Sequence, residues 1–354
     1  MCKVYNQIGC LTTIKSHLHQ HNVHEYKSLN ELMNFQKNYS ATRQQIIFDH
    51  KLLIEEEKNI LSNEIIQLED SIKIKKKEVE QELLLGLEKL KYQLNNLSST
   101  HSNFIQAFLN YIKKNGLKRK IRNNELTFDS KITHSLQYVT ENYNIKNNRH
   151  QYIVSHFDDA VMESCSPQLQ EVDRKKRIVD QVNSSIYGAL GEQKVVRELE
   201  KLSDDYVLIN DFTCRFHRAI YNRSENDYIQ SIQIDHILIS TSGIFLIETK
   251  NWSQHSLKDA NLYSPVQQIK RTNFALYKIL NGGALGLGKH HWGDRKIPIR
   301  NLIVFIQYKP TEEFQYVKTL TLNELLRYLD YFKPCFSANE TQTIANHLIN
   351  FRRK

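Results

Sequence analysis

The stretch IQIDHILISTSGIFLIETKNW, residues 232–252, decides the fold of the C-terminal half of the chain. Two runs rich in isoleucine, leucine and phenylalanine flank the turn-forming residues 240–243, so the stretch predicts a β-hairpin. Because side chains alternate across a strand, Glu248 and Lys250 point to the same face as Ile244 and Leu246. The hairpin therefore presents a carboxylate and an amine on a face that otherwise belongs to a core.

The loop length fixes which residues of the two strands oppose each other. A loop of two or four residues centred between Thr241 and Ser242 places Asp235 opposite Glu248. Two opposed carboxylates on a half-buried sheet repel each other unless a cation lies between them. Hard oxygen ligands suit Mg²⁺ or Mn²⁺, which predicts a metal site. The alternative is a structural ion pair between Lys250 and one of the carboxylates.

Further β-rich runs lie on either side of the hairpin, at YVLIND (206–211) and NLIVFIQYK (301–309). Helical patterns occur at residues 186–202 and in SPVQQIKRTNFALYKIL (264–280). Strands mixed with helices predict an α/β or α+β domain over residues 185–354.

Residues 28–100 contain no proline and one glycine, and they predict a long helix. Its apolar residues follow heptad a and d positions and then resume after an offset: Ile54, Leu61, Ile65, Leu68, Ile72 and Val79, then Leu83, Leu87, Leu90, Leu94 and Leu97. The spacing predicts a coiled coil. Its partner is either the same chain folded back as a hairpin or another chain, which would give an oligomer.

The rest of the N-terminal half divides into two parts. Residues 101–184 are predicted to be a helical connector, broken around NGLKRK (115–120) and at Pro167. Residues 1–27 form a separate N-terminal segment that contains four closely spaced histidines: His17, His19, His21 and His24. On a strand these histidines would suit a transition metal, but their spacing matches no closed zinc site.

The composition of the whole chain limits its partners. The 354 residues carry a formal net charge of +9 with a pI near 9.1, which favours an anionic partner. No apolar segment approaches the length of a membrane span, and no signal peptide is visible, so we expect a cytoplasmic protein without a membrane partner. The five cysteines are scattered and odd in number, which indicates reduced thiols.

Three motifs that follow one another along the C-terminal half are specific enough to compare with a known family. They are G-x-x-G-E at residues 188–192, Q-x-D-H at 233–236 and I-E-T-K-N-W at 247–252. With SPVQQIKR at 264–271, this set resembles the nuclease-related domain, the NERD family of the PD-(D/E)xK nuclease superfamily. The resemblance covers about residues 185–310 and leaves out the N-terminal half.

The resemblance implies a restriction-endonuclease-like fold, with a mixed central sheet flanked by helices. It implies that Asp235 and Glu248 bind Mg²⁺ or Mn²⁺, with the main-chain carbonyl of Thr249 as a further ligand. It makes Glu192 an acidic residue that reaches the metal directly or through water. Lys250 would act on the attacking water and on the charge of the phosphate. Supporting positions are Gln233 and Gln268.

The predicted activity is metal-dependent hydrolysis of nucleic-acid phosphodiester bonds, with DNA favoured over RNA. Four cations are candidate phosphate contacts: Arg215, Arg218, Lys270 and Arg271. The N-terminal helices would bind a second copy or a partner protein, in a setting such as defence against foreign DNA or DNA repair. One alternative is a nuclease-like protein that binds nucleic acid without cutting it. Another is a coiled-coil scaffold or sensor whose nuclease is gated by a partner.

Overall fold

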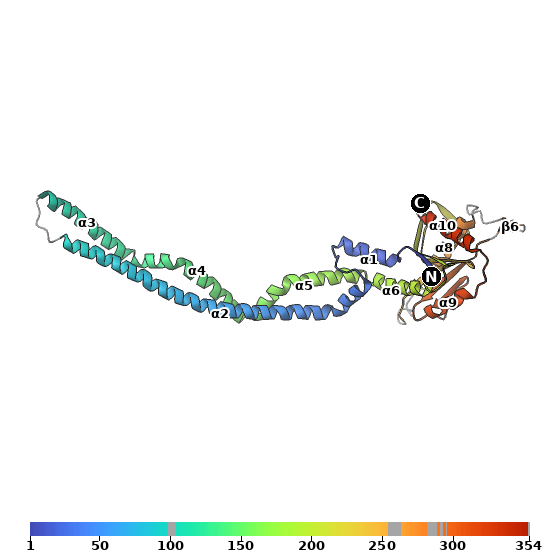
Figure 1. Ribbon diagram of the computed structural model, residues 1–354, viewed down its shortest axis with the longest axis horizontal. Helices are drawn as coiled ribbons and strands as arrows, with labels where there is room; N and C mark the ends of the chain where they lie inside the picture. The colour runs from blue at the N-terminus through green and yellow to red at the C-terminus, as the bar shows by residue number, and fades with distance from the viewer. Residues whose placement is uncertain (98–103, 254–262, 282–288, 291–292, 295, 353–354) are drawn as a thin grey trace. The chain divides into compact units, whose positions relative to one another are not determined.

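A computed structural model describes residues 1–97, 104–253, 263–281, 289–290, 293–294 and 296–352 (Figure 1). The chain divides into two compact units. One, which we call the sheet unit, combines two separate segments, Met1–Lys37 and Arg174–Lys354. The other, the helical unit, comprises Asn38–Asp173. We describe each unit by itself.

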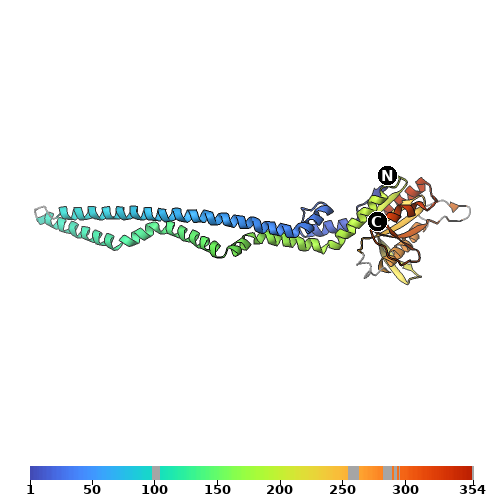
Figure 2. The same cartoon turned by 90° about the horizontal axis from the view of Figure 1, so that it is seen from below.

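The helical unit is an antiparallel hairpin of helices. Its outgoing arm belongs to the long helix α2, and three successive helices form the return arm (Figures 1 and 2). Their bounds are α2 Leu29–Asn96, α3 Phe104–Leu126, α4 Phe128–Ser155 and α5 Phe157–Gln181. Ion pairs connect the arms in opposite order along the chain: Lys91 with Glu125, Glu64 with Lys146, Glu57 with Arg149 and Arg43 with Asp173. This confirms the long helix predicted for residues 28–100.

The heptad positions of α2 face the return arm of the same chain. Ile54 and Leu61 are buried together with Ile153, Ala160 and Val161. The hairpin alternative therefore accounts for this part of the seam. Contrary to the expected break at residues 115–120, α3 runs through them, because a lone glycine weakens a helix without ending it. No helix in the described part of the chain combines the length and apolar character needed to cross a membrane.

The sheet unit is built on a mixed sheet of six strands in the order β1-β2-β3-β4-β7-β8. The bounds are β1 Lys3–Tyr5, β2 Val207–Asn222, β3 Asp227–Ser240, β4 Gly243–Lys250, β7 Ile299–Phe305 and β8 Val317–Thr321. β2, β3 and β4 are antiparallel neighbours, whereas β1 pairs with β2, β4 with β7 and β7 with β8 in parallel. A separate two-stranded sheet pairs β5 Lys289–His290 with β6 Gly293–Asp294.

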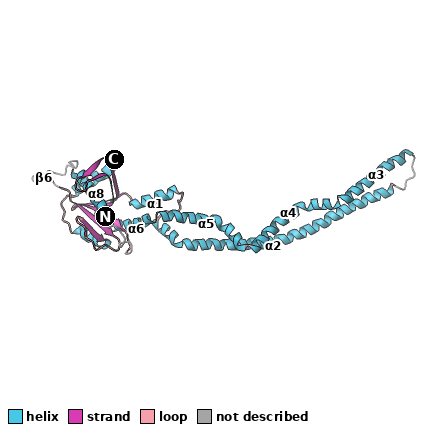
Figure 3. Cartoon of the chain, turned by 180° about the vertical axis from the view of Figure 1, so that it is seen from behind, coloured by secondary structure: helices cyan, strands magenta, loops and turns pink. Residues whose placement is uncertain are grey.

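Helices cover both faces of the six-stranded sheet (Figure 3). On one face, residues of α8 Tyr263–Asn281 and α10 Ala338–Arg352 share a buried cluster with Ile244 and Leu246 of β4. On the other face, residues of α6 Asn183–Leu199 and α9 Leu322–Asp330 share a buried cluster with Phe245 and Ile247. Because β4 lies between two covered faces, it reads as a continuous apolar run. The predicted mixed sheet flanked by helices is confirmed.

The N-terminal segment belongs to the sheet unit, which differs from the expected separate segment at residues 1–27. Lys3–Tyr5 forms the edge strand beside β2, and α1 Gly9–Gln20 packs against α6. Ile14 and Leu18 of α1 share a buried cluster with Ile186 of α6. The sheet unit is therefore completed by residues far from its main strands in the sequence. For example, Asn6 hydrogen-bonds Asn210, which is 204 positions away.

Candidate functional site

The β3–β4 hairpin has the register that the sequence predicts. Ser240 pairs with Gly243 across the two-residue turn Thr241–Ser242, and the ladder extends to His236 opposite Ile247. Gly243 has φ of +121° and lies against Pro298, a conformation and a space that only glycine tolerates. One further step in this register brings Asp235 and Glu248 to opposing positions.

Asp235 and Glu248 lie where the ladder of main-chain hydrogen bonds stops. The Asp235 Oδ2 atom accepts a hydrogen bond of 2.7 Å from the main-chain N–H of Thr249, so the side chain replaces the next rung of the ladder. Thr249 thus enters the site through its amide, whereas the expected role of its carbonyl stays a prediction. This bond fixes Asp235 against the residue that follows Glu248.

Glu248 and Lys250 form a salt bridge on the same face of β4. The Lys250 Nζ atom donates to Glu248 Oε1 at 2.7 Å, and the two side chains are 21% and 4% exposed. The second oxygen, Oε2, is buried and has no hydrogen-bond partner among the described residues. The ion pair therefore satisfies half of the carboxylate, and leaves one desolvated acceptor at the site.

The electrostatics of the site reflect several carboxylates in a desolvated place. Burial raises the pKa of Asp235 well above its usual range, and the charges of Glu248 and Glu192 raise it further. Burial alone would lower the pKa of Lys250, but Glu248 and Asp235 outweigh it and raise the pKa. Lys250 is therefore held protonated by an excess of negative charge.

Glu192 reaches the same group of charges from helix α6. It is buried, and its pKa is raised first by burial and also by the charges of Asp211 and Glu248. The thiol and the main-chain N–H of Cys10 hydrogen-bond to it, while its Oε2 has no partner in the described part of the chain. The preceding Gly191 allows α6 to approach Thr249 closely. No sequence pattern points to Cys10, because its position beside Glu192 follows from long-range packing.

The two supporting glutamines lie together next to Asp235. Gln268 Nε2 donates to the main-chain carbonyl of Gln233 at 3.4 Å, and Thr272 Oγ1 donates to the same oxygen. The side chain of Gln233 donates to Asp211 Oδ1 at 3.3 Å. Asp211 itself has φ of +47° within β2. Sequence reasoning missed Asp211, which accepts the hydrogen bond of Gln233 from β2.

The four predicted phosphate contacts separate into two sets. Arg215 and Arg218 are exposed on the extended β2–β3 ribbon. Lys270 and Arg271 lie on α8, one turn beyond Gln268. Arg271 is held by an ion pair of 2.6 Å with Asp227 of the ribbon.

Two groups of histidines lie outside this site. His236 is fully buried on the opposite face of β3, where Nδ1 hydrogen-bonds Asn210 Oδ1 at 2.8 Å and burial lowers its pKa to about 3. The N-terminal histidines lie on helix α1 and the turn after it, so the strand considered for them is wrong. Their rings contact each other in pairs, His17 and His21 tilted at 54° and His19 and His24 edge to face at 68°.

The donor set at Asp235 and Glu248 fits a hard divalent cation. Two carboxylates meet on one face, and Glu248 Oε2 is a buried acceptor that lacks a proton donor. No three His, Cys, Asp or Glu side chains in the described residues are close enough to hold an ion by themselves. An ion would therefore take these two carboxylates together with water, and Glu192 would act through water.

A mixed sheet covered on both faces, with two carboxylates and a lysine where a hairpin ladder ends, defines a class of α/β domain with a compact acidic site. Residues 187–306 match the family model of the nuclease-related domain, NERD. The match spans the sequence from α6 to the end of β7, so this part of the chain is similar to the nuclease-related domain, the resemblance that its motifs predicted. The chain has no match among curated proteins or solved structures.

Proposed function

We propose that this protein is a metal-dependent nuclease that hydrolyses nucleic-acid phosphodiester bonds, with DNA as its substrate. The observation that carries the proposal is the buried Glu248, which shares its face with Asp235 and Lys250 and keeps one oxygen without a partner in the described chain. A purely structural ion pair would leave no such acceptor. The family match at residues 187–306 supports the same reading.

The roles follow from the chemistry of each side chain. Asp235 and Glu248 would hold Mg²⁺ or Mn²⁺, which supplies Lewis acidity toward a phosphoryl oxygen when bound. Lys250, kept protonated by its neighbours, stabilises negative charge on the phosphate and orients water by hydrogen bonding. Glu192 contributes a second negative group from α6. Gln268 and Gln233 hold the strand segment that carries Asp235.

Regions outside the acidic site would bind the partners of the protein. The net charge of +9 favours a polyanion, and exposed Arg215 and Arg218 extend the positive surface beyond the acidic site. The helical unit serves oligomerisation or docking of a partner protein, because α2 keeps exposed apolar side chains besides its buried seam, such as Ile60 and Ile74. A cytoplasmic role in defence against foreign DNA or in repair fits such an arrangement.

The test is a cleavage assay on the full chain with supercoiled plasmid, linear duplex, single-stranded DNA and RNA, in Mg²⁺, Mn²⁺ or EDTA. Glu248→Gln keeps the size of the side chain and should reduce metal-dependent cutting about a hundredfold or more. Lys250→Met should do the same. The matched control is Glu198→Gln, which removes a carboxylate of α6 that pairs with Lys201 at the surface.

Cutting that persists in Glu248→Gln and Lys250→Met would contradict the proposal. Binding of DNA with no cutting in any metal would support the alternative of a nuclease-like binding protein. Cutting that begins only after a partner is added would support gating through the helical unit.

A further inference from the structure

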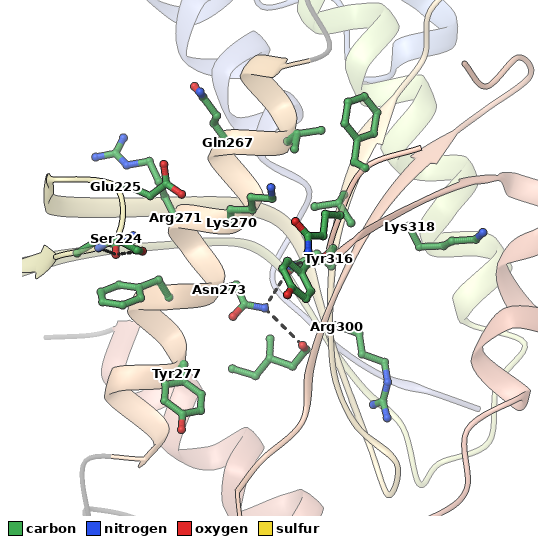
Figure 4. Close-up of a pocket in the computed structure, with 18 of the residues that line it drawn as sticks. Ser224, Glu225, Gln267, Lys270, Arg271, Asn273, Tyr277, Arg300, Tyr316 and Lys318 are labelled. Atoms are coloured by element: carbon green, nitrogen blue, oxygen red, sulfur yellow. Dashed lines mark hydrogen bonds between the residues drawn. The ribbon is translucent and has the colours of Figure 1, made fainter. Parts of the chain in front are cut away.

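A large groove lies beside α8, away from the acidic site but on the same face of the sheet. It has a volume of about 1480 Å³ and is lined by α8, the tip of the β2–β3 ribbon, β7 and the segment that leads into β8 (Figure 4). Pockets for small molecules have volumes of roughly 300–1,000 Å³. The groove is therefore large enough for a segment of a polymer.

One end of the groove lies beside the turn of α8 that contacts the strand carrying Asp235. Gln267 and Lys270 line its first part, on either side of Gln268, which donates to the carbonyl of Gln233. It then follows one face of α8 to Tyr277, about 13 Å farther along the helix axis. A strand bound in the groove would thus pass the turn of α8 that contacts the Asp235 strand through Gln268.

The opposite wall presents Tyr316 on a strained backbone. Its ring is 78% exposed, and its φ is +67°, a conformation that bulky residues rarely adopt. A chain of hydrogen bonds holds it there: Asn273 of α8 donates to Asn301 Oδ1 at 2.8 Å, and Asn301 donates to the carbonyl of Tyr316 at 2.9 Å. Figure 4 shows Asn273 between the helix and Tyr316. A partly buried relay of hydrogen bonds therefore supports an exposed aromatic side chain.

Charge along the groove favours an anionic ligand. Five cationic and three acidic side chains line it. Arg271 and Asp227 neutralise each other, and Arg300 stacks on Phe332 at 3.9 Å from the ring centroid. Three lysines remain: Lys278 lies over the Phe274 ring, whereas Lys270 on α8 and Lys318 on the other wall are placed to contact phosphate. Tyr277 and Tyr316 add aromatic surfaces (Figure 4).

Aromatic rings interleaved with lysines match the way proteins hold single strands, because unpaired bases stack on rings while lysines contact phosphates. In a duplex the bases are stacked on one another and offer no free face. We infer that this groove binds single-stranded nucleic acid, with Tyr316 as a stacking platform and Lys270 and Lys318 as phosphate contacts. The inference rests on the proposed nuclease function and names the form of substrate that reaches its site.

The test measures binding without cleavage. Fluorescence anisotropy of the full chain in EDTA compares a labelled 15-nucleotide single strand with a duplex of the same length. Tyr316→Asn removes the ring but suits the left-handed backbone, and it should weaken single-strand binding about tenfold with little effect on the duplex. Tyr316→Phe should bind as the wild type does. Lys318→Ala should reduce the salt dependence of single-strand binding by about 0.7 in the slope of log K against log salt.

The control is Tyr138→Ala, which removes another highly exposed tyrosine, 80% accessible, from the helical unit. Equal single-strand affinity in Tyr316→Asn and wild type would overturn the inference, as would an equal loss in Tyr138→Ala. Cleavage that persists in Glu248→Gln would contradict the proposed function without affecting this inference. The two tests are independent, because binding in EDTA does not require cleavage.

Discussion

The two units both pair glutamate with a cation, but they do so in different surroundings. In the helical unit Arg149 binds Glu57 with side chains 36% and 37% exposed, so water screens the pair. In the sheet unit Lys250 binds Glu248 with the carboxylate 4% exposed, next to a second carboxylate. The first pair only connects two helix surfaces. The second concentrates negative charge where water is largely excluded, which is the arrangement expected of a reactive site.

The strongest contrast should come from removing the cation of each pair. Lys250→Met leaves Glu248 and Asp235 buried without compensation, and should reduce the free energy of unfolding of the sheet unit by about 3 kcal/mol. Arg149→Met should cost the helical unit about 1 kcal/mol or less. Both tryptophans, Trp252 and Trp292, lie within residues 174–354, so urea titration followed by tryptophan fluorescence reports on the sheet unit.

Equal losses of unfolding free energy in Lys250→Met and Arg149→Met would contradict this comparison of the two ion pairs. Circular dichroism at helical wavelengths follows the helical unit in the same titration. A wild-type tryptophan transition in Arg149→Met serves as the control.

Helix glycines provide a second contrast. A Cβ atom at Gly191 would lie 2.9 Å from the Cβ of Asn251, so Gly191→Ala should push α6 away from β4 and cost about 1–3 kcal/mol. Gly86 on α2 has no atom within 4 Å of such a Cβ, and Gly86→Ala should stabilise the helical unit by about 0.5–1 kcal/mol. Thermal unfolding of both variants checks the opposite signs. If both variants shifted the unfolding temperature in the same direction, α6 would not lie as close to Thr249 and Asn251 as the structure shows.

The smallest expected effect is a pH dependence at the start of α9. Glu324 accepts hydrogen bonds from Lys309 and Thr321, which lower its pKa to about 2. Because the folded pKa lies below the model-peptide value of 4.5, its stabilising contribution is complete above that pH and is lost as pH falls toward 2. Exposure of the side chain screens the effect. Urea titrations at pH 6 and pH 3 should differ less in Glu324→Gln than in wild type.

The sequence predicted the features that depend on local periodicity. The parity of the Thr241–Ser242 turn placed Asp235 and Glu248 on one face, and the heptads placed Ile54 and Leu61 in a helical seam. Such local patterns could not predict which segments pair when they lie far apart in the sequence. Three residues of β1 carry no strand signal until β2 pairs with them, and the histidine spacing fits helix and strand equally well.

The same division holds for the candidate site: its local arrangement could be predicted from the sequence, and its long-range contacts could not. Motif order singled out Glu192, Asp235, Glu248 and Lys250 as candidates, and strand geometry explains how three of them lie at one hairpin. Neither motif nor periodicity indicates that Cys10 hydrogen-bonds Glu192, or that Asp211 accepts a hydrogen bond from Gln233. The first contact exists only after the N-terminal segment has packed against α6, and the second only after β2 has paired with β3.

The edge strand β1 has a consequence for the order of events during synthesis. Lys3 pairs with Val207, and the neighbouring Asn6 and Asn210 are 204 residues apart. At about 5–20 residues per second, a ribosome needs roughly ten to forty seconds to make the chain between them. The helical hairpin can close during that interval, because all its residues precede β2. The sheet unit and its candidate site are therefore completed last, when the β1 residues meet strands that have only just emerged.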